Sequence, residues 1–435
     1  MTVPRVAPNP VAVGPLGLEE PLTVDAGFDR CCQAALQDSV IGPVGLEIET
    51  HLVDLDRPGD RVGWARVEAM LGVLPGVAGR NAITVEPGGQ LELSGPPDSD
   101  AGAAAIRLRH DVQAARLALA ELRLGLAHAG ADPVRSSRRV NPRSRYQAME
   151  QHMAATGRGD CAAVMMNSTA ALQVNLDAGP RRGWASRVAL ANRLGPTLLA
   201  MSACSPWLHG RDTGWKSARQ RAWAGLDPRA CGPVAGCVAR SPAADDDLDP
   251  ASAWARYALA APVTFVRTTR GEVSAVSGTV SFGQWASGAV RLGHRAPTAA
   301  DLDVHLTTLF PPVRLRGYLE LRYLDMTPPR WWPGIAAVAA TLMDDPVAAD
   351  HVIDATEQTA ELWTEAARDG LGHAALADSA RRCVGLAAGR VPAALASAVA
   401  DLAELIESGR CPGDLLAERI TEIGPLAAFA ELAHA

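Results

Sequence analysis

The chain has 435 residues and a formal net charge of −7, with 48% hydrophobic and 20% charged residues. This composition is ordinary for a globular protein, and the acidic balance creates no basic field, so nucleic acid is not expected as a partner. No apolar run approaches the roughly 18–20 residues of a membrane-spanning helix, and the N-terminus lacks the pattern of a signal peptide, so no membrane association is expected. The eight cysteines have neither metal-binding nor disulfide-framework spacing, which favours a reducing, cytoplasmic location.

The chain shows no internal repeat and no stretch with the composition of a linker. Residues 1–21 lack periodicity and are predicted to form a flexible arm. Residues 22–435 are predicted to form a single α+β domain, in which 335–435 is a helical C-terminal section. The oligomeric state is open, with a monomer favoured.

Two hydrophobic periods predict the elements: alternation predicts strands, and a spacing of three to four residues predicts helices. Helices are predicted over 22–36, 65–74, 100–129, 142–153, 185–204 and 251–260, and through most of the chain from 335 onward. Strands are predicted over 44–54, 171–177, 263–268 and 313–324, with a hairpin over 84–94. Residues 241–250 contain a run of aspartates and are predicted to be a mobile surface loop.

The hairpin places two carboxylates near one tight turn. Pro87 presets the backbone for the turn, and Gly88 and Gly89 supply conformations that a Cβ atom would forbid. Glu86 stands at the entry to this turn, and Glu92 lies on the polar face of the strand after it. Two carboxylates held this close can repel each other or share a cation.

Polar residues spaced two apart recur on distant predicted strands. The pairs are Glu47 with Glu49, Gln90 with Glu92, Gln173 with Asn175, and Glu320 with Arg322. If these strands join one antiparallel sheet, the pairs line one cavity, and oxygen ligands of this kind suit Mg²⁺ or Mn²⁺ that carries a polyphosphate. For any one segment the alternative is the solvated face of a half-buried sheet, and for the amide pair it is a cross-strand ladder.

A second constellation is the basic segment that holds Arg219 and Arg221 between Trp215 and Trp223. It could clamp a substrate carboxylate or phosphate, or it could be a solvated helix face. The sequence contains no Gly-rich phosphate loop of the Walker type and no dinucleotide fingerprint. Any nucleotide must therefore be bound in another way.

Several motifs resemble those of glutamate–cysteine ligases of the plant and bacterial type. They are Gly45-Leu46-Glu47-Ile48-Glu49, the block from Glu86 to Ser94, Arg145-Tyr146 with Met149, Met165-Met166 followed by Gln173–Asp177, Arg219 with Trp223, His305–Pro311, and Tyr318–Arg322. They follow the family order over about residues 40–330. The composition and the compact helical tail most resemble the actinobacterial branch, which supplies γ-glutamylcysteine for ergothioneine synthesis.

The resemblance implies a fold like the catalytic domain of glutamine synthetase, in which a curved antiparallel sheet, flanked by helices, forms a funnel-shaped active site. It implies that ATP phosphorylates the γ-carboxylate of glutamate, and that the amine of L-cysteine then displaces phosphate. Mg²⁺ is the implied cofactor, with Mn²⁺ possible, and ATP is a co-substrate. The alternatives are a carboxylate–amine ligase with another acceptor, or a non-catalytic metal- and nucleotide-binding protein of the same fold.

The resemblance also implies roles for particular residues. Glu47, Glu49, Glu86, Glu92 and Glu320 would be metal ligands. Arg322, with Glu320, would contact ATP and act in catalysis together with Arg219, and the amino-acid substrates would contact Arg219, Arg221, Gln173, Asn175, Tyr146 and Trp223. One departure is visible, because plant members carry a basic residue about where Ser168 stands.

Overall fold

The computed structural model describes residues 20–74, 82–237, 249–268 and 272–434. Most of the predicted N-terminal arm and most of the predicted loop at 241–250 lie outside these ranges. The centre of the fold is one sheet in which every neighbouring pair of strands is antiparallel, in the order β10-β11-β5-β1-β3-β2, with β4 pairing the far part of β1. The strands are β1 (Val44–Asp54), β2 (Ala82–Val85), β3 (Leu91–Ser94), β4 (Leu124–Ala127), β5 (Ala171–Asp177), β10 (Val313–Leu315) and β11 (Tyr318–Asp325).

Alternation along these strands separates an apolar face from a polar one. The apolar face is buried almost completely, with at most 1% exposure for Leu46, Ile48, Leu91, Leu93, Leu172, Val174, Leu176, Leu319 and Leu321. Each such side chain contributes about 1.5–3 kcal/mol when it is fully buried. This face therefore anchors the sheet, and it leaves the polar face free for chemistry.

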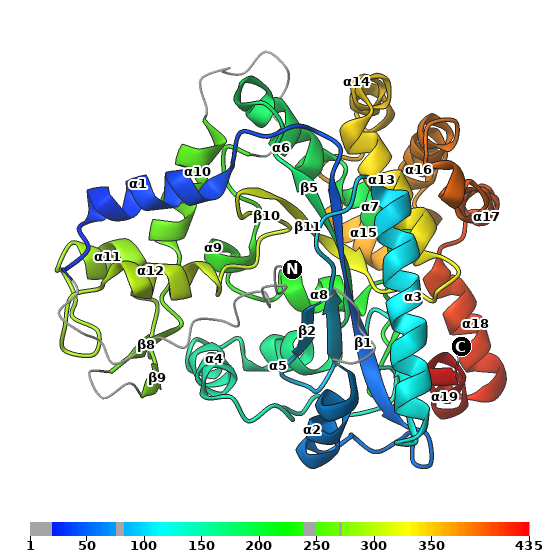
Figure 1. The fold of residues 1–435 in the computed structure, drawn as a ribbon, viewed down its shortest axis with the longest axis horizontal. Helices are drawn as coiled ribbons and strands as arrows, with labels where there is room; N and C mark the ends of the chain where they lie inside the picture. Colours follow the sequence, from blue (N-terminus) through cyan, green and yellow to red (C-terminus); the bar gives the residue numbers. More distant parts are fainter. Residues whose placement is uncertain (1–19, 75–81, 238–248, 269–271, 435) are drawn as a thin grey trace, which may run out of the picture.

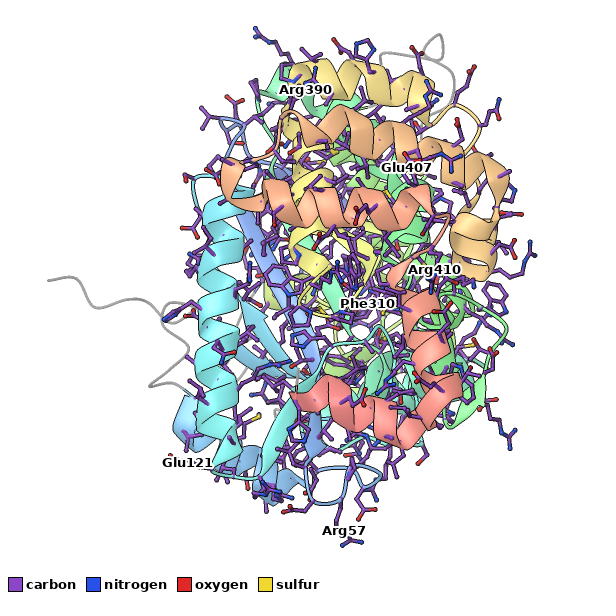
Figure 2. The ribbon with its side chains drawn as sticks, turned by 90° about the vertical axis from the view of Figure 1, so that its right-hand side faces the viewer. Arg57, Glu121, Phe310, Arg390, Glu407 and Arg410 are labelled. Atoms are coloured by element: carbon purple, nitrogen blue, oxygen red, sulfur yellow. The ribbon has the colours of Figure 1, made fainter. Side chains whose placement is uncertain are left out.

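Helices cover the apolar face in layers (Figure 1). The helices on this side are α3 (Ala101–Ala120), α6 (Trp184–Arg193), α7 (Gly195–Ser202), α13 (Trp332–Asp344), α14 (Pro346–Ala355), α15 (Trp363–Asp369), α16 (Ala374–Ala388), α17 (Ala396–Glu407), α18 (Pro412–Ile423) and α19 (Pro425–His434). Figure 2 shows α3 with the C-terminal helices as the outer surface, and Arg410 lies between α17 and α18. Within the described ranges, no helix combines the length and apolar character that crossing a bilayer requires.

A second group of elements lies on the other side of the sheet (Figure 1). They are α1 (Val24–Ala35), α4 (Ser144–Ala155), α5 (Gly159–Ser168), α8 (Ala218–Ala224), α9 (Pro228–Cys231), α10 (Pro250–Ala260), α11 (Phe282–Ala286), α12 (Ala299–Leu306) and the ribbon of β8 (Phe265–Arg267) and β9 (Val273–Ala275). The remaining elements are α2 (Trp64–Val73), the hairpin of β6 (Trp207–Leu208) and β7 (Arg211–Asp212), and short 3₁₀ helices at Arg181–Gly183, Gly370–Gly372 and Ala393–Leu395. The polar sheet face is therefore covered by α1 and by elements from the middle of the chain.

Most predicted elements are confirmed, and the antiparallel α+β class with its helical C-terminal section is confirmed too. The prediction of one helix over 100–129 is wrong, because α3 ends at Ala120 and the chain continues as β4. Arg123 has a φ of 54°, which ends the helix, and a Cβ atom at Gly125 would lie 2.6 Å from the carbonyl of Ala433. The strand β4 has four residues, all buried, so its sequence lacks the alternation that would distinguish it from the last turns of a helix.

Two other predicted elements are each divided into two in the structure. The helix over 185–204 is two helices that meet at Gly195, where a Cβ atom would collide with Trp363. The strand over 313–324 is the hairpin β10–β11, which turns at Arg316-Gly317 with a φ of 81° at the glycine. The second division matters for function, because it brings another arginine onto the polar face. Helix α5 was not predicted, and the strand over 263–268 is shorter than predicted.

Candidate active site

Polar side chains from five strands line the polar face, and their charge changes from mainly basic on β10 and β11 to acidic on β1 and β3. Its members are Arg314 on β10, Glu320 and Arg322 on β11, Gln173 and Asn175 on β5, Glu47 and Glu49 on β1, and Glu92 on β3. Direct pairing joins Glu320 to Asn175, Gln173 to Glu47, and Glu49 to Glu92. The prediction that the four polar segments share one sheet face is therefore confirmed. Gln90 is the exception, because it is buried beneath the turn.

The half of the face on β1 and β3, with the turn before β3, is acidic. Neutral groups donate to three of its carboxylates: Asn175 Nδ2 to Glu47 at 2.7 Å, the backbone of Ala171 to Glu49 at 2.8 Å, and Thr84 to Glu92. The amide of Gln173 lies between two of them, with Nε2 at 3.3 Å from Glu49 and 3.4 Å from Glu92. No arginine or lysine among the described residues forms an ion pair within 4 Å of any of these carboxylates.

Burial and mutual repulsion make this acidic half reluctant to ionise. Burial, and then Glu86, raise the pKa of Glu49 to about 8, although Arg219 and Arg322 oppose the shift. Burial raises the pKa of Glu92 well above its usual value, and Glu47, Glu86 and Glu49 add to the effect. Burial also raises the pKa of Glu86, against the influence of Arg145. Such a cluster ionises fully only when a cation compensates it.

The turn that carries Glu86 is held tightly against α5. A Cβ atom at Gly88 would lie 2.2 Å from the carbonyl oxygen of Asn167, so no larger residue fits there. Gln90 Nε2 donates to the carbonyl of Thr169 at 2.9 Å, and Asn141 Nδ2 donates to that of Val85 at 2.8 Å. The carboxylate of Glu86 accepts no hydrogen bond from the described residues, so it remains available to a ligand.

The other half of the face is basic, and here the prediction for Glu320 does not fit the geometry. Arg314 donates twice to the Glu320 carboxylate, at 2.5 and 2.9 Å, while Arg322 lies at 3.1 Å and Arg316 at 3.6 Å. Burial alone would raise the pKa of Glu320, but these arginines hold it at about 2. A fully buried carboxylate surrounded by three guanidinium groups is a poor metal ligand, and its evident role is to position Arg322.

Arg219 and Arg322 meet beside two aromatic rings. The Arg219 and Arg322 guanidinium groups lie 5.5 and 6.0 Å from the Trp223 ring, and Arg322 lies 5.8 Å from the Phe310 ring. Arg219 Nη2 donates to the carbonyl of Arg322 at 2.6 Å, and buried Asp325 lies 3.7 Å from Arg219 Nη1. The two arginines are therefore fixed against each other by backbone and aromatic contacts.

Several buried donors at this place have no partner among the described residues. They are Nε of Arg219, Nε of Arg322 and Nε1 of Trp223, while Nη1 of Arg219 has no hydrogen bond and only the longer ion pair with Asp325. Arg219 is only 2% exposed, and unpaired buried donors are costly unless a ligand satisfies them. The arrangement is that of a binding site for a phosphate or carboxylate.

The two arginines predicted to act together in the segment between Trp215 and Trp223 point in different directions in the structure. Arg219 and Trp223 face the sheet, whereas Arg221 is exposed and lies over the Trp215 ring at 5.5 Å. Residues two apart on a helix point in different directions, so the pairing of Arg219 with Arg221 in one clamp does not fit the geometry. Tyr146 is half-buried on α4 within electrostatic range of Glu86 and Glu92, as expected for a residue of this site.

The donor set fits Mg²⁺ or Mn²⁺ in its chemistry, because all four candidate side chains offer carboxylate oxygens. Within the described part of the chain, however, no three Asp, Glu, His or Cys side chains are assembled as a chelate. Mg²⁺ is commonly held by one or two carboxylates together with substrate phosphates and water. The face therefore suits a cation that arrives with a phosphate.

At Ser168 a basic group is supplied from elsewhere in the chain. Nη2 of Arg61 donates to the Ser168 hydroxyl at 3.0 Å, and its Nε donates to the carbonyl of Ser136 at 2.7 Å. Nη1 of the same guanidinium lies 3.4 Å from the carbonyl of Gly88, in the turn that carries Glu86. Arg61 thus ties this turn to the end of α5.

Sequence reasoning missed Arg314 and Asp325, which position Arg322 and Arg219. Asp325 accepts from the hydroxyls of Ser205 at 2.6 Å and Ser217 at 2.9 Å, and from the backbone of Cys204 at 3.0 Å. For Arg314 a signal existed, because Val313-Arg314-Leu315 alternates in the same way as the other strands.

Comparison with known proteins places the chain in a class that this sheet and site fit. The family model for glutamate–cysteine ligase family 2 matches residues 43–430, so the chain belongs to this family. It is 49% identical over 399 residues to glutamate–cysteine ligase EgtA of Mycolicibacterium smegmatis, a match that covers 92% of each chain. It is 45% identical to EgtA of Mycobacterium tuberculosis over 94% of this chain and 93% of the relative, so the actinobacterial likeness is confirmed.

Solved structures support the fold. The structure superimposes on the glutamate–cysteine ligase of Francisella tularensis in complex with AMP with a TM-score of 0.55. The match covers 92% of this chain and 88% of the other, at 14% sequence identity. At this identity the likeness concerns the fold alone, and the predicted likeness to glutamine synthetase stays a prediction, as does the single-domain partition.

Proposed function

We propose that the protein is an ATP-dependent glutamate–cysteine ligase, which joins the γ-carboxylate of glutamate to the amine of L-cysteine and releases ADP and phosphate. The observation that carries the proposal is the separation of charge across one sheet face. The carboxylates on β1 and β3 accept hydrogen bonds from neutral groups but form no ion pair among the described residues, and guanidinium nitrogens beside β11 lack a hydrogen-bond partner. The first half suits divalent cations, and the second suits a phosphoryl group or carboxylate. The names of the mycobacterial relatives support the same activity.

Under this proposal Glu47, Glu49, Glu86 and Glu92 would hold Mg²⁺ or Mn²⁺, which when bound would neutralise phosphate charge. Glu320 is reassigned from metal ligand to the group that orients Arg322.

Arg219 and Arg322 would stabilise negative charge on the transferring phosphoryl group and on the glutamate carboxylate. Gln173 would hold its place between Arg322, whose Nη1 donates to Oε1 at 2.5 Å, and the carboxylates of Glu49 and Glu92.

Two substitutions at different centres make up the reaction. An oxygen of the glutamate γ-carboxylate attacks the terminal phosphorus of ATP, and ADP leaves with the bridging electrons. The unprotonated amine of cysteine then attacks the acyl carbon, phosphate leaves, and one proton is released from the nitrogen. The chain's contribution is to position these groups and to stabilise charge.

The setting of the reaction is part of the proposal. All eight cysteines are unpaired, which suits a reducing cytoplasm, and the product would supply ergothioneine synthesis. A monomeric state stays a prediction.

The test is phosphate release by the purified protein with glutamate, ATP and Mg²⁺ and each of a panel of amines. The expected result is release that depends on cysteine, together with γ-glutamylcysteine as product. Equal release with another amine would make the protein a different carboxylate–amine ligase. Nucleotide binding without ADP formation in any mixture would make it a non-catalytic binding protein.

A further inference from the structure

Lysine and arginine together number 41 in this sequence, and Lys216 is the only lysine. It stands between Trp215 and Ser217, the residue that caps the start of α8. Its Nζ pairs at 2.5 Å with Oδ1 of Asp414, which lies 198 residues later in the chain, in the first turn of α18. The one lysine therefore joins the segment that carries Arg219 to the helical C-terminal section.

One oxygen of the Asp414 carboxylate is already engaged within α18. Its Oδ2 accepts from the backbone N–H of Cys411 at 2.8 Å and from the Cys411 thiol at 3.2 Å, and the Lys216 ammonium group meets the other oxygen. An arginine fork matches two carboxylate oxygens, whereas an ammonium group is a point charge that one oxygen satisfies. The backbone beside the lysine is also close, because a Cβ atom at Gly370 would lie 3.1 Å from Lys216 Cγ. Both features favour lysine at this position, in a chain that otherwise uses arginine.

The backbone at Lys216 is connected to Arg219 through two serines. The backbone N–H of Ser205 donates to the carbonyl of Lys216 at 3.1 Å, and the Ser205 hydroxyl accepts from the backbone N–H of Arg219 at 3.2 Å. The hydroxyl of Ser217, the next residue, donates to Asp325 at 2.9 Å, and Asp325 lies 3.7 Å from Nη1 of Arg219. A shift of Lys216 would therefore reach both the backbone and the guanidinium group of Arg219.

Helix α18 also touches this part of the chain through its backbone. The N–H of Gly413 donates to the carbonyl of Ala203 at 2.8 Å, and a Cβ atom at Gly413 would lie 2.8 Å from the same oxygen. The ion pair itself is partly exposed, with 35% exposure of the Lys216 side chain and 18% of the Asp414 side chain, and such pairs contribute little to stability. The pair is therefore better suited to fixing the place of α8 than to holding the fold together.

We propose that the ion pair between Lys216 and Asp414 positions Arg219 for the reaction, so that the helical C-terminal section takes part in forming the active site. Lys216 is in this role a positioning residue, which acts through Ser217 and Asp325 and not through contact with a substrate. The inference rests on the proposed function, because the group that it positions is one that the reaction uses.

The experiment compares Lys216→Met, Lys216→Arg and Asp414→Asn with the wild-type enzyme, and combines Lys216→Met with Arg219→Lys. Arg419→Met is the matched control, because Arg419 lies on the same helix but forms its ion pairs within the C-terminal section. Two quantities are measured: kcat and KM with glutamate varied, and the hydrogen exchange of α8 peptides by mass spectrometry. Melting temperatures identify any variant that does not fold.

A chemical modification of the folded wild type carries the test if the variants do not fold. An amine-reactive acetylating reagent can modify only Lys216 and the terminal amine, since the chain has no other lysine. Activity is followed against the modified fraction of each amine. Loss of activity should follow the acetylation of Lys216 and not that of the terminal amine.

We expect kcat/KM for glutamate to fall by about five- to thirtyfold in Lys216→Met and Asp414→Asn, since a small misplacement of a group that acts on the substrate is costly. Lys216→Arg keeps the charge without the fit and should lose less, and Arg419→Met should lose nothing. In the Arg219→Lys background, Lys216→Met should cause less than about twofold further loss, because the group that it positions is already altered. Exchange of the α8 amides should be about tenfold faster in Lys216→Met and Asp414→Asn and unchanged in Arg419→Met.

Two results would reduce the pair to a structural contact and overturn the inference. One is a full additive loss when Lys216→Met is combined with Arg219→Lys, and the other is unchanged kcat/KM in Lys216→Met or in the protein acetylated at Lys216. A wild-type protein without cysteine-dependent turnover overturns the proposed function instead. Hydrogen exchange then decides the inference: unchanged exchange of α8 in Lys216→Met or in the acetylated protein overturns it, and faster exchange supports it.

Discussion

The two halves of the polar sheet face treat a buried glutamate in opposite ways. On β11, Glu320 is surrounded by Arg314, Arg316 and Arg322, and its pKa lies at about 2. On β1, Glu49 receives hydrogen bonds from a backbone amide and from Gln173 alone among the residues that the structure describes, and its pKa is about 8. The chain contains enough arginine to neutralise both halves, yet it places the arginines on one side. A fold selected for stability alone would pair these charges, so the separation points to a ligand that bridges them.

The largest expected effect is on turnover. Glu92→Gln removes a carboxylate from the acidic half, so cysteine-dependent phosphate release should fall by about a thousandfold or more. Because a repelled carboxylate is removed, the melting temperature at pH 8 without metal should stay the same or rise. The matched control is Glu68→Gln on the exposed face of α2, which should change neither quantity. Near-normal activity of Glu92→Gln would remove this residue from the metal site.

The same substitution in the basic half should have the opposite effect on stability. Glu320→Gln leaves the guanidinium groups of Arg314 and Arg322 without their carboxylate, and removal of one partner from a buried ion pair costs about 3–5 kcal/mol. Urea unfolding should therefore show a clear loss for Glu320→Gln where Glu92→Gln shows none. Equal stability changes in the two variants would contradict the charge separation.

The two arginines of α8 offer a comparison over a short distance. Arg219→Lys keeps the charge but not the forked donors, so we expect kcat/KM to fall by about a hundredfold. Arg221→Lys should change it less than about twofold, because Arg221 is exposed over Trp215. Steady-state kinetics with glutamate as the varied substrate would check this, and similar losses in both variants would restore the two-arginine clamp that the sequence suggested.

The two halves of the sheet face should also contribute to folding stability over different pH ranges. The folded pKa of Glu49, about 8, exceeds its ordinary value of 4.5, so its contribution to stability is present below about pH 4.5 and is lost as pH rises to about 8. For Glu320 the folded pKa is depressed to about 2, so its contribution is present above pH 4.5 and is lost as pH falls towards 2. Melting curves should therefore show a decline of a few kcal/mol between pH 5 and 8.5, which Glu49→Gln reduces. A flat profile in the wild type would contradict the raised pKa.

Alternation was enough to predict most of the side chains that share the polar face, because a strand with one buried face fixes the direction of every second residue. Glu47, Glu49, Glu92, Gln173 and Arg322 all lie where the pattern indicated.

Alternation could not show which charges meet across strands. The partners of Glu320 became visible only when 313–324 proved to be a hairpin, since the turn at Gly317 brings Arg314 opposite Glu320. The nearness of Arg221 to Arg219 in the sequence suggests one clamp, but residues two apart on a helix point in different directions. Asp325 and Arg61 were missed because their partners lie far away in the chain.

The most direct test of the central claim is the binding of Mn²⁺, measured by electron paramagnetic resonance, with and without ADP. In the wild type and in Glu68→Gln, Mn²⁺ binding should become tight when ADP is present, because the carboxylates and the phosphates complete one ligand set. In Glu92→Gln the binding should be weaker by at least about tenfold. Binding of equal strength in all three proteins would show that the acidic half of the sheet does not hold the metal, and the account would fail.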